Sequence, residues 1–147
     1  MTRVVARGTF DLLHPGHVHY LPEAAAMGDE PHVVVANGDR VSHKDPVVPD
    51  AQRVQVVAAL DPVTAAHPGH SKGISAPIRR IDPDLLVLGG DQHHDEDEVA
   101  SMLAAWGVDC EVRRAAVAES GEDERYSTSD IVDRILAERG EKAVPRP

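Results

Sequence analysis

Cysteine and long apolar runs are nearly absent from this chain of 147 residues. Cys110 is the only cysteine, which excludes an internal disulfide and a C-x-x-C metal or redox motif and favours a reducing compartment. No stretch approaches the roughly 18 consecutive apolar residues of a transmembrane helix. The amino terminus lacks the apolar region and cleavage site of a signal peptide. We therefore expect a cytoplasmic protein with no membrane partner.

Aromatic residues and lysines are also scarce. The aromatic side chains number four, and three lysines stand against twelve arginines. The formal net charge of −10 repels phosphate backbones, so we expect no nucleic-acid partner. A surface rich in carboxylates and poor in lysine is typical of proteins from a salt-rich cytoplasm, where ions screen the repulsion. The composition therefore predicts a salt-adapted protein.

Five short apolar runs alternate with five segments of helical periodicity. The runs cover 3–6, 32–36, 63–66, 85–88 and 108–112, and the helical segments cover 15–27, 49–60, 74–81, 97–106 and 127–139. Continuous apolar runs suit strands that are buried on both faces. The alternation predicts an α/β fold, a single Rossmann-like doubly wound parallel five-stranded sheet. Its ligand site should lie at the carboxyl ends of the strands. We also expect Asp50 to cap the second helix.

The segment from Gly8 to His17 reads Gly-Thr-Phe-Asp-Leu-Leu-His-Pro-Gly-His and joins the first strand to the first helix. Pro15 suits the first helical position, and Gly16 leaves room for a phosphate. Free amide groups of the first turn, together with the helix dipole, should attract an anion. His14 and His17 lie three residues apart, on one face of that turn, and both rings can donate hydrogen bonds to phosphate oxygens. Neither a G-x-G-x-x-G nor a G-K-[ST] sequence occurs.

This segment resembles the signature of the cytidylyltransferase-like nucleotidyltransferase superfamily, which ends in H-x-G-H. Three further segments are similar to the family's pattern and occur in its order. They are the region from Lys44 to Arg53, the Gly89-Gly90-Asp91-Gln92 turn after the fourth strand, and Tyr126-Ser127-Thr128-Ser129 before the last helix. The resemblance covers most of the chain. It implies one nucleotidyltransferase domain over residues 1–140, and we expect a disordered tail over 141–147.

The resemblance also implies roles for individual residues. Catalytic roles fall on His14, His17 and Lys44, which would offset the charge that develops on the phosphates. Nucleotide contacts would come from Thr9, Phe10, His14, Pro15, Gly16, His17, Asp91, Tyr126, Ser127 and Thr128, with the backbone of Thr9 and Phe10 taking part. The attacking phosphate monoester is already ionised near neutral pH, so no general base is needed. A divalent ion such as Mg²⁺ is expected on the pyrophosphate, and no metal site is expected in the protein itself.

Within the superfamily the chain most resembles the archaeal FAD synthases, which join ATP and FMN. The acidic composition agrees with that resemblance, and Tyr126 could stack on a flavin ring. The cysteine pair that this group often has near its carboxyl end is missing from 119–129. The redox sensitivity linked to that pair is therefore not expected here. The superfamily is commonly dimeric, so a homodimer is expected.

Two alternatives remain open from the sequence. The first is a CTP-dependent glycerol-3-phosphate cytidylyltransferase, although the arginine-threonine-x-glycine sequence that precedes I-S-T-T in that group is replaced by 122–126. The second is a non-catalytic nucleotide- or metal-binding module. It is suggested by the histidines and carboxylates of 91–98 and by the smaller group of His67 and His70. The ordinary interpretation of these residues is a solvated acidic loop with incidental histidines.

Overall fold

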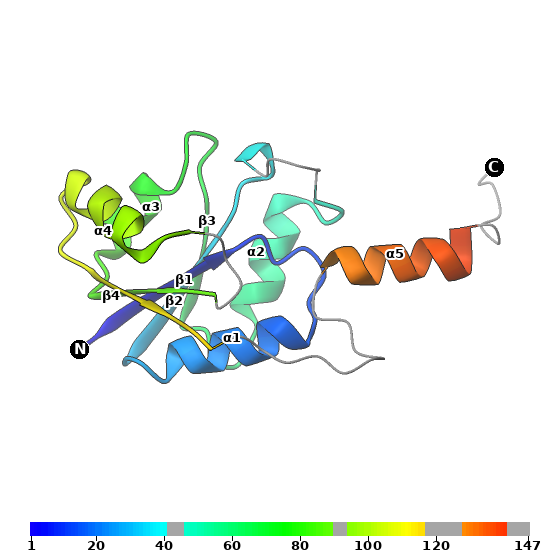
Figure 1. The fold of residues 1–147 in the computed structure, drawn as a ribbon, viewed down its shortest axis with the longest axis horizontal. Coiled ribbons are helices and arrows are strands. Elements are labelled where there is room, and N and C mark those ends of the chain that lie inside the picture. The colour runs from blue at the N-terminus through cyan, green and yellow to red at the C-terminus, as the bar shows by residue number, and fades with distance from the viewer. Residues whose placement is uncertain (41–45, 90–93, 117–127, 141–147) are drawn as a thin grey trace.

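The computed structural model describes residues 1–40, 46–89, 94–116 and 128–140. Its elements are, in chain order, β1 (Arg3–Gly8), α1 (Pro15–Ala25), β2 (Glu30–Val35), the short 3₁₀ helix η1 (Gly38–Arg40), α2 (Asp50–Ala58), β3 (Ala65–Pro68), α3 (Ser75–Ile81), β4 (Leu85–Leu88), α4 (Glu96–Ala105), β5 (Glu111–Arg114) and α5 (Thr128–Arg139). The strands form one parallel sheet in the order β3-β2-β1-β4-β5 (Figure 1). The predicted fold class is therefore confirmed.

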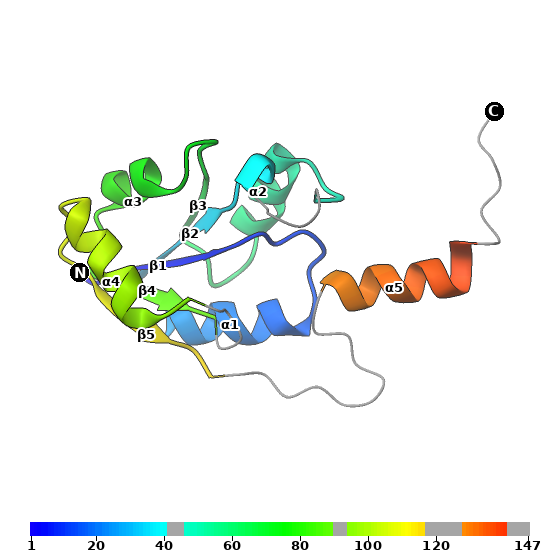
Figure 2. The same ribbon diagram turned by 45° about the horizontal axis from the view of Figure 1, so that its top comes forward.

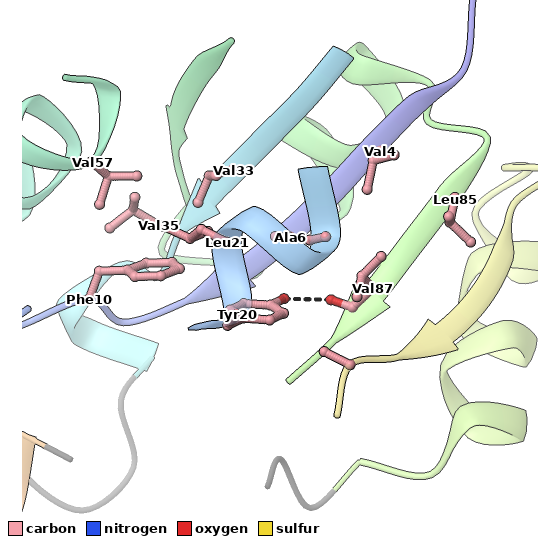
Figure 3. Close-up of a cluster of buried hydrophobic side chains, with 12 residues drawn as sticks. Val4, Ala6, Phe10, Tyr20, Leu21, Val33, Val35, Val57, Leu85 and Val87 are labelled. Atoms are coloured by element: carbon pink, nitrogen blue, oxygen red, sulfur yellow. Dashed lines mark hydrogen bonds between the residues drawn. The ribbon is translucent and has the colours of Figure 1, made fainter. Parts of the chain in front are cut away.

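Helices cover both faces of this sheet. One hydrophobic cluster joins α1 and α2 to alternate strand residues such as Val4 and Val87, and Figure 3 shows its members. A second cluster joins α3 and α4 to the intervening residues, such as Val5 and Leu86. Because successive side chains of a strand point to opposite faces, a sheet covered on both sides needs apolar residues at every position. This explains the unbroken apolar runs of the sequence.

The fifth strand begins later than the apolar run 108–112 predicts. Helix α4 ends at Ala105 and is followed by Gly107, whose φ is +78°, and the Val108 amide donates to the Leu103 carbonyl oxygen at 2.9 Å. Val108 is buried beside Leu103 in the second cluster. An apolar residue that packs back on the last turn is typical of this kind of helix end. The prediction was therefore wrong at 108–110, because β5 begins at Glu111 and Val108 packs back on the end of α4.

The predicted cap of the second helix is also wrong. The structure places Pro49 at the cap position, with no side-chain cap hydrogen bond. The Asp50 carboxylate instead accepts from the Gly38 amide at 3.1 Å and pairs with the buried guanidinium of Arg53. A buried cation requires a nearby anion or carbonyl oxygen, and that requirement draws Asp50 away from the capping role.

Helix α5 extends away from the end of the sheet in both ribbon views (Figures 1 and 2). None of its residues is buried, and Ile135 and Leu136 are 49% and 62% exposed. The predicted apolar stripe exists, but in the described part of the chain it does not pack on the sheet. The expected tail, 141–147, lies outside the described residues. No described helix is long and apolar enough to cross a bilayer.

Candidate active site

Two histidines close the first turn of α1. His14 is the residue before the helix and has an extended backbone, with φ −149° and ψ 173°. Its Nδ1 accepts from the Gly16 amide at 3.1 Å, and Nδ1 of His17 accepts from the His14 amide at 3.3 Å. The two rings lie against each other, with centroids 3.8 Å apart and planes tilted by 31°. This reciprocal arrangement is a capping box built from two imidazoles.

The cap determines which ring atoms can donate. Because Nδ1 of each ring accepts from a backbone amide, the hydrogen of each neutral imidazole must lie on Nε2. Burial, together with the nearby His14 ring, lowers the pKa of His17 to about 4. His17 is therefore uncharged at neutral pH. The turn thus holds a neutral Nε2–H donor on His17, beside the matching tautomer of His14.

The amides of this turn are occupied, which differs from the sequence-based expectation of free amides. The Gly16 amide bonds to the His14 ring, and the amides of His17 and Val18 donate to the His14 carbonyl oxygen at 3.0 and 3.3 Å. The predicted attraction for an anion would therefore come from the helix dipole and the Nε2–H groups rather than from free amides. The imidazoles thus satisfy the backbone amides of His14 and Gly16 through their Nδ1 atoms.

Phe10 accounts for part of the sequence around the end of β1. Its φ is +53°, a left-handed conformation that costs energy for a residue with a Cβ. Its ring is buried in the first hydrophobic cluster and lies 5.0 Å from the ring of His17. A Cβ added at Gly8 would sit 3.0 Å from the Phe10 ring. The ring therefore packs against His17 and is buried, and the expected contact of the Phe10 backbone with a ligand remains a prediction.

Asp11 joins this loop to the segment before α2. Its two carboxylate oxygens accept from the amides of Val47 and Val48, each at 2.8 Å. Sequence reasoning missed this role. An aspartate between a strand and a helix is a common local cap, and nothing in the sequence indicates a partner 36 residues away.

Arg53 holds three backbone segments of the same region together. It is 1% exposed, and its guanidinium donates to the carbonyl oxygens of Val48 at 2.8 Å, Thr9 at 2.9 Å and Ala36 at 2.8 Å. These bonds hold the loop after β1, the end of β2 and the start of α2 together. Sequence analysis placed Arg53 in a family region without this role. The available signal was a charged residue four positions before Val57, on the apolar face of its helix.

A second arginine holds the carboxyl end of β4. Arg114 donates to the Gly89 carbonyl oxygen at 3.1 Å and to the His94 carbonyl oxygen, and it pairs with Glu96 at 2.6 Å. The guanidinium therefore bridges the end of β4 and the start of α4. Both arginines act on loops at the carboxyl edge of the sheet, where the fold places ligand sites. The sequence did not indicate Arg114.

A family model for cytidylyltransferase-like proteins matches residues 5–134. The chain belongs to the cytidylyltransferase-like family. Several archaeal relatives at high identity are named FAD synthase. The one from Halobacterium salinarum is 59% identical, over 96% of this chain and 98% of its own length. The one from Haloferax volcanii is 55% identical, over 95% and 99%. These matches confirm the predicted resemblance over nearly the whole chain.

A solved structure supports the same membership in this family. The crystal structure of a lipopolysaccharide core biosynthesis protein from Thermoplasma volcanium matches with a TM-score of 0.77 and 36% sequence identity. The match covers 81% of this chain and 99% of the other. The cytidylyltransferase-like fold is therefore common to proteins that carry different names. The choice of substrate must then come from residues at the site.

The structure brings together those predicted residues of this cytidylyltransferase-like protein that it describes. Thr9, Phe10 and the turn from His14 to His17 form one region, and Thr128 lies against it. The Thr128 hydroxyl donates to the Leu12 carbonyl oxygen at 3.2 Å and joins the start of α5 to the loop after β1. Its expected phosphate contact remains a prediction. Lys44, Asp91, Tyr126 and Ser127 lie outside the described residues.

Several residues behind the metal-module alternative have other partners in the described part of the chain. The Asp95 carboxylate caps α4, accepting from the Asp97 amide at 2.7 Å. His67 pairs with His32 across neighbouring strands, with Nε2 of His67 and Nδ1 of His32 3.0 Å apart, rather than with His70. No group of three or more metal-ligating side chains gathers among the described residues. The metal-module alternative therefore gains no support from the described residues.

Proposed function

We propose that this chain is an FAD synthase, which transfers the adenylyl group of ATP to the phosphate of FMN and releases pyrophosphate. The observation that supports nucleotidyl transfer is the imidazole pair, whose neutral Nε2–H groups extend from the amino end of α1 beside the end of β1. The choice of ATP and FMN is supported by the relatives named FAD synthase, which match nearly full length.

The reaction is an in-line displacement at the α-phosphorus. A phosphate oxygen of FMN forms a bond to that phosphorus, and the bond to the oxygen that bridges the α- and β-phosphorus atoms breaks. The electron pair leaves with pyrophosphate. No residue needs to take a proton from the nucleophile, so the protein binds, orients and stabilises charge. His14 and His17 donate to phosphate oxygens, and the dipole of α1 adds to the positive potential.

A divalent ion, Mg²⁺ or a similar metal, is proposed to accompany the triphosphate. Mg²⁺ typically keeps several waters and binds through substrate phosphates, so we propose an ion held mainly by phosphate oxygens and water. When bound, it neutralises charge on the departing pyrophosphate.

The roles of the residues outside the described segments remain part of this proposal. Lys44 is proposed as a phosphate ligand, Asp91 as a ribose or base contact, and Ser127 as a phosphate ligand at the last helix. Tyr126 is proposed to contact the nucleotide or the flavin. We also propose a domain limit near residue 140, a homodimer and a cytoplasmic location. Sedimentation at high salt would measure the mass of the assembly.

A substrate matrix tests the proposed function. ATP and CTP are each combined with FMN, glycerol 3-phosphate and phosphopantetheine in Mg²⁺ and concentrated KCl, and pyrophosphate release is measured with product identification. We expect FAD from ATP and FMN alone. CDP-glycerol would indicate the cytidylyltransferase alternative instead. No pyrophosphate from any combination would favour a nucleotide-binding module without turnover.

A further inference from the structure

Tyr20 connects three elements near the site. It lies on α1, three residues after His17, and its side chain is buried in the first cluster. Its hydroxyl donates to the Val87 carbonyl oxygen of β4 at 2.5 Å, the bond drawn in Figure 3. The same hydroxyl accepts from the Arg7 amide of β1 at 3.2 Å. One oxygen therefore contacts the neighbouring strands β1 and β4 from the helix that holds the histidines.

These contacts lie where the chain reverses the direction in which it adds strands to the sheet. β1 pairs with β2 as far as Gly8 and Val35, whereas its pairing with β4 ends at Ala6 and Val87. The chain builds β2 and β3 on one side of β1 and then places β4 on the other side. The gap between β1 and β4, beyond Ala6 and Val87, is therefore the topological switch point of the sheet. The Tyr20 hydroxyl sits at the last paired position before the gap. It therefore lies at the carboxyl ends of β1 and β4, where folds of this class bind ligands.

Packing alone does not require this hydroxyl. A phenylalanine would fill the space of the ring within the same apolar cluster. Burial raises the pKa of Tyr20 to about 12, so the phenol remains protonated and able to donate over the whole working range of pH. What the hydroxyl adds is a fixed connection from α1 to β1 and β4.

We propose that Tyr20 is a positioning residue, whose hydroxyl holds the amino end of α1, and with it His14 and His17, at a fixed place relative to the carboxyl ends of β1 and β4. The inference rests on the proposed function and extends it. The histidines approach the phosphates from α1, while the backbone of Thr9 and Phe10, a further proposed contact, follows directly on β1. A small shift between these two bodies misplaces the donors in the transition state, and such shifts can reduce turnover about a hundredfold.

The test compares Tyr20→Phe with Leu85→Val. Leu85 belongs to the same cluster and to the same strand β4, but lies at its opposite, amino end. Both variants remove buried contacts, so thermal melts establish that each is folded and how far each is destabilised. We expect Tyr20→Phe to lower kcat roughly 10- to 100-fold with little change in the KM for ATP, as expected when only transition-state contacts are lost. Leu85→Val should keep wild-type kinetics.

Hydrogen exchange of the Arg7 amide provides a readout that does not depend on turnover. We expect exchange to accelerate at least about tenfold in Tyr20→Phe and to stay unchanged in Leu85→Val. Wild-type kcat in Tyr20→Phe, a loss confined to KM, an equal loss of kcat in Leu85→Val, or unchanged Arg7 exchange would each overturn the inference. A wild-type chain that makes no FAD would instead refute the proposed function, and Arg7 exchange would still test the connection.

Discussion

At the scale of single residues, the loss of the Nε2–H donor of His17 should reduce turnover most directly. We expect His17→Ala to lose roughly 100- to 1,000-fold in turnover while remaining folded, because one donor to the developing charge is removed. His19→Ala is the matched control, since His19 is an exposed histidine of the same helix that pairs with Glu23 at 3.3 Å. Steady-state kinetics of FAD formation make the comparison. Near-normal turnover in His17→Ala would refute the assignment.

The buried His17 should also make folding sensitive to acid. Its pKa is about 4 in the folded chain against 6.5 for the free side chain, so between these values the unfolded state binds the extra proton. Stability from this group is therefore complete above about pH 6.5 and is lost as pH falls toward 4, by at most about 3 kcal/mol. Denaturant unfolding at a series of pH values measures this slope. His67, whose pKa is also lowered, contributes in the same direction.

The His17→Gln variant is the control for this slope. Glutamine cannot titrate, so the variant should lose less stability than the wild type between pH 6.5 and 4, whatever its stability at neutral pH. Equal slopes in the two proteins would mean that His17 is not neutral in the folded state. A His67→Gln variant separates the smaller contribution of the strand pair.

At the scale of elements, two neighbouring arginines of β5 offer a comparison. Arg114 bridges the end of β4 and the start of α4, whereas Arg113 pairs with Glu111 on the exposed side of its own strand. We expect Arg114→Gln to raise the KM for ATP roughly tenfold, because the segment between the bridged ends includes Asp91. Arg113→Gln removes the same charge and should change the KM less than twofold.

Equal effects of the two substitutions would show that Arg114 acts through net charge alone. A melting temperature for each variant completes the comparison. We expect the lower value for Arg114→Gln, since exposed pairs such as that of Arg113 stabilise little.

At the scale of the whole molecule, the net charge of −10 decides how stability responds to salt. Repulsion among surface carboxylates opposes the compact state, and salt screens it because the Debye length falls from about 10 Å at 0.1 M to about 3 Å at 1 M. We expect the melting temperature to rise steadily as KCl increases from 0.1 to 2 M. The salt-adapted interpretation of the sequence agrees with relatives from halophilic archaea. A flat or falling melting temperature would contradict it.

The sequence predicted the fold well because its signals are local. Strand and helix periodicities, Pro15 at a helix start and glycine after a strand depend on neighbours within a few residues, so alternation alone indicated the parallel sheet. The mistakes at Val108 and Asp50 occurred where a residue's partner was not the expected neighbour. Val108 packs back on α4, and Asp50 pairs with the buried Arg53. Local patterns indicate that a residue is apolar or charged but do not indicate its partner.

The sequence by itself determined the family, the layered α/β architecture and the turn from His14 to His17, since the motif is contiguous and its chemistry follows from residue type. Only the tertiary structure decided that His17 is neutral, that Arg53 and Arg114 fix the loops, and that Tyr20 joins α1 to the neighbouring strands β1 and β4. These facts depend on burial and on contacts between residues as many as 67 positions apart. Such contacts form only when the chain is folded, because folding removes water and brings distant groups within hydrogen-bonding distance.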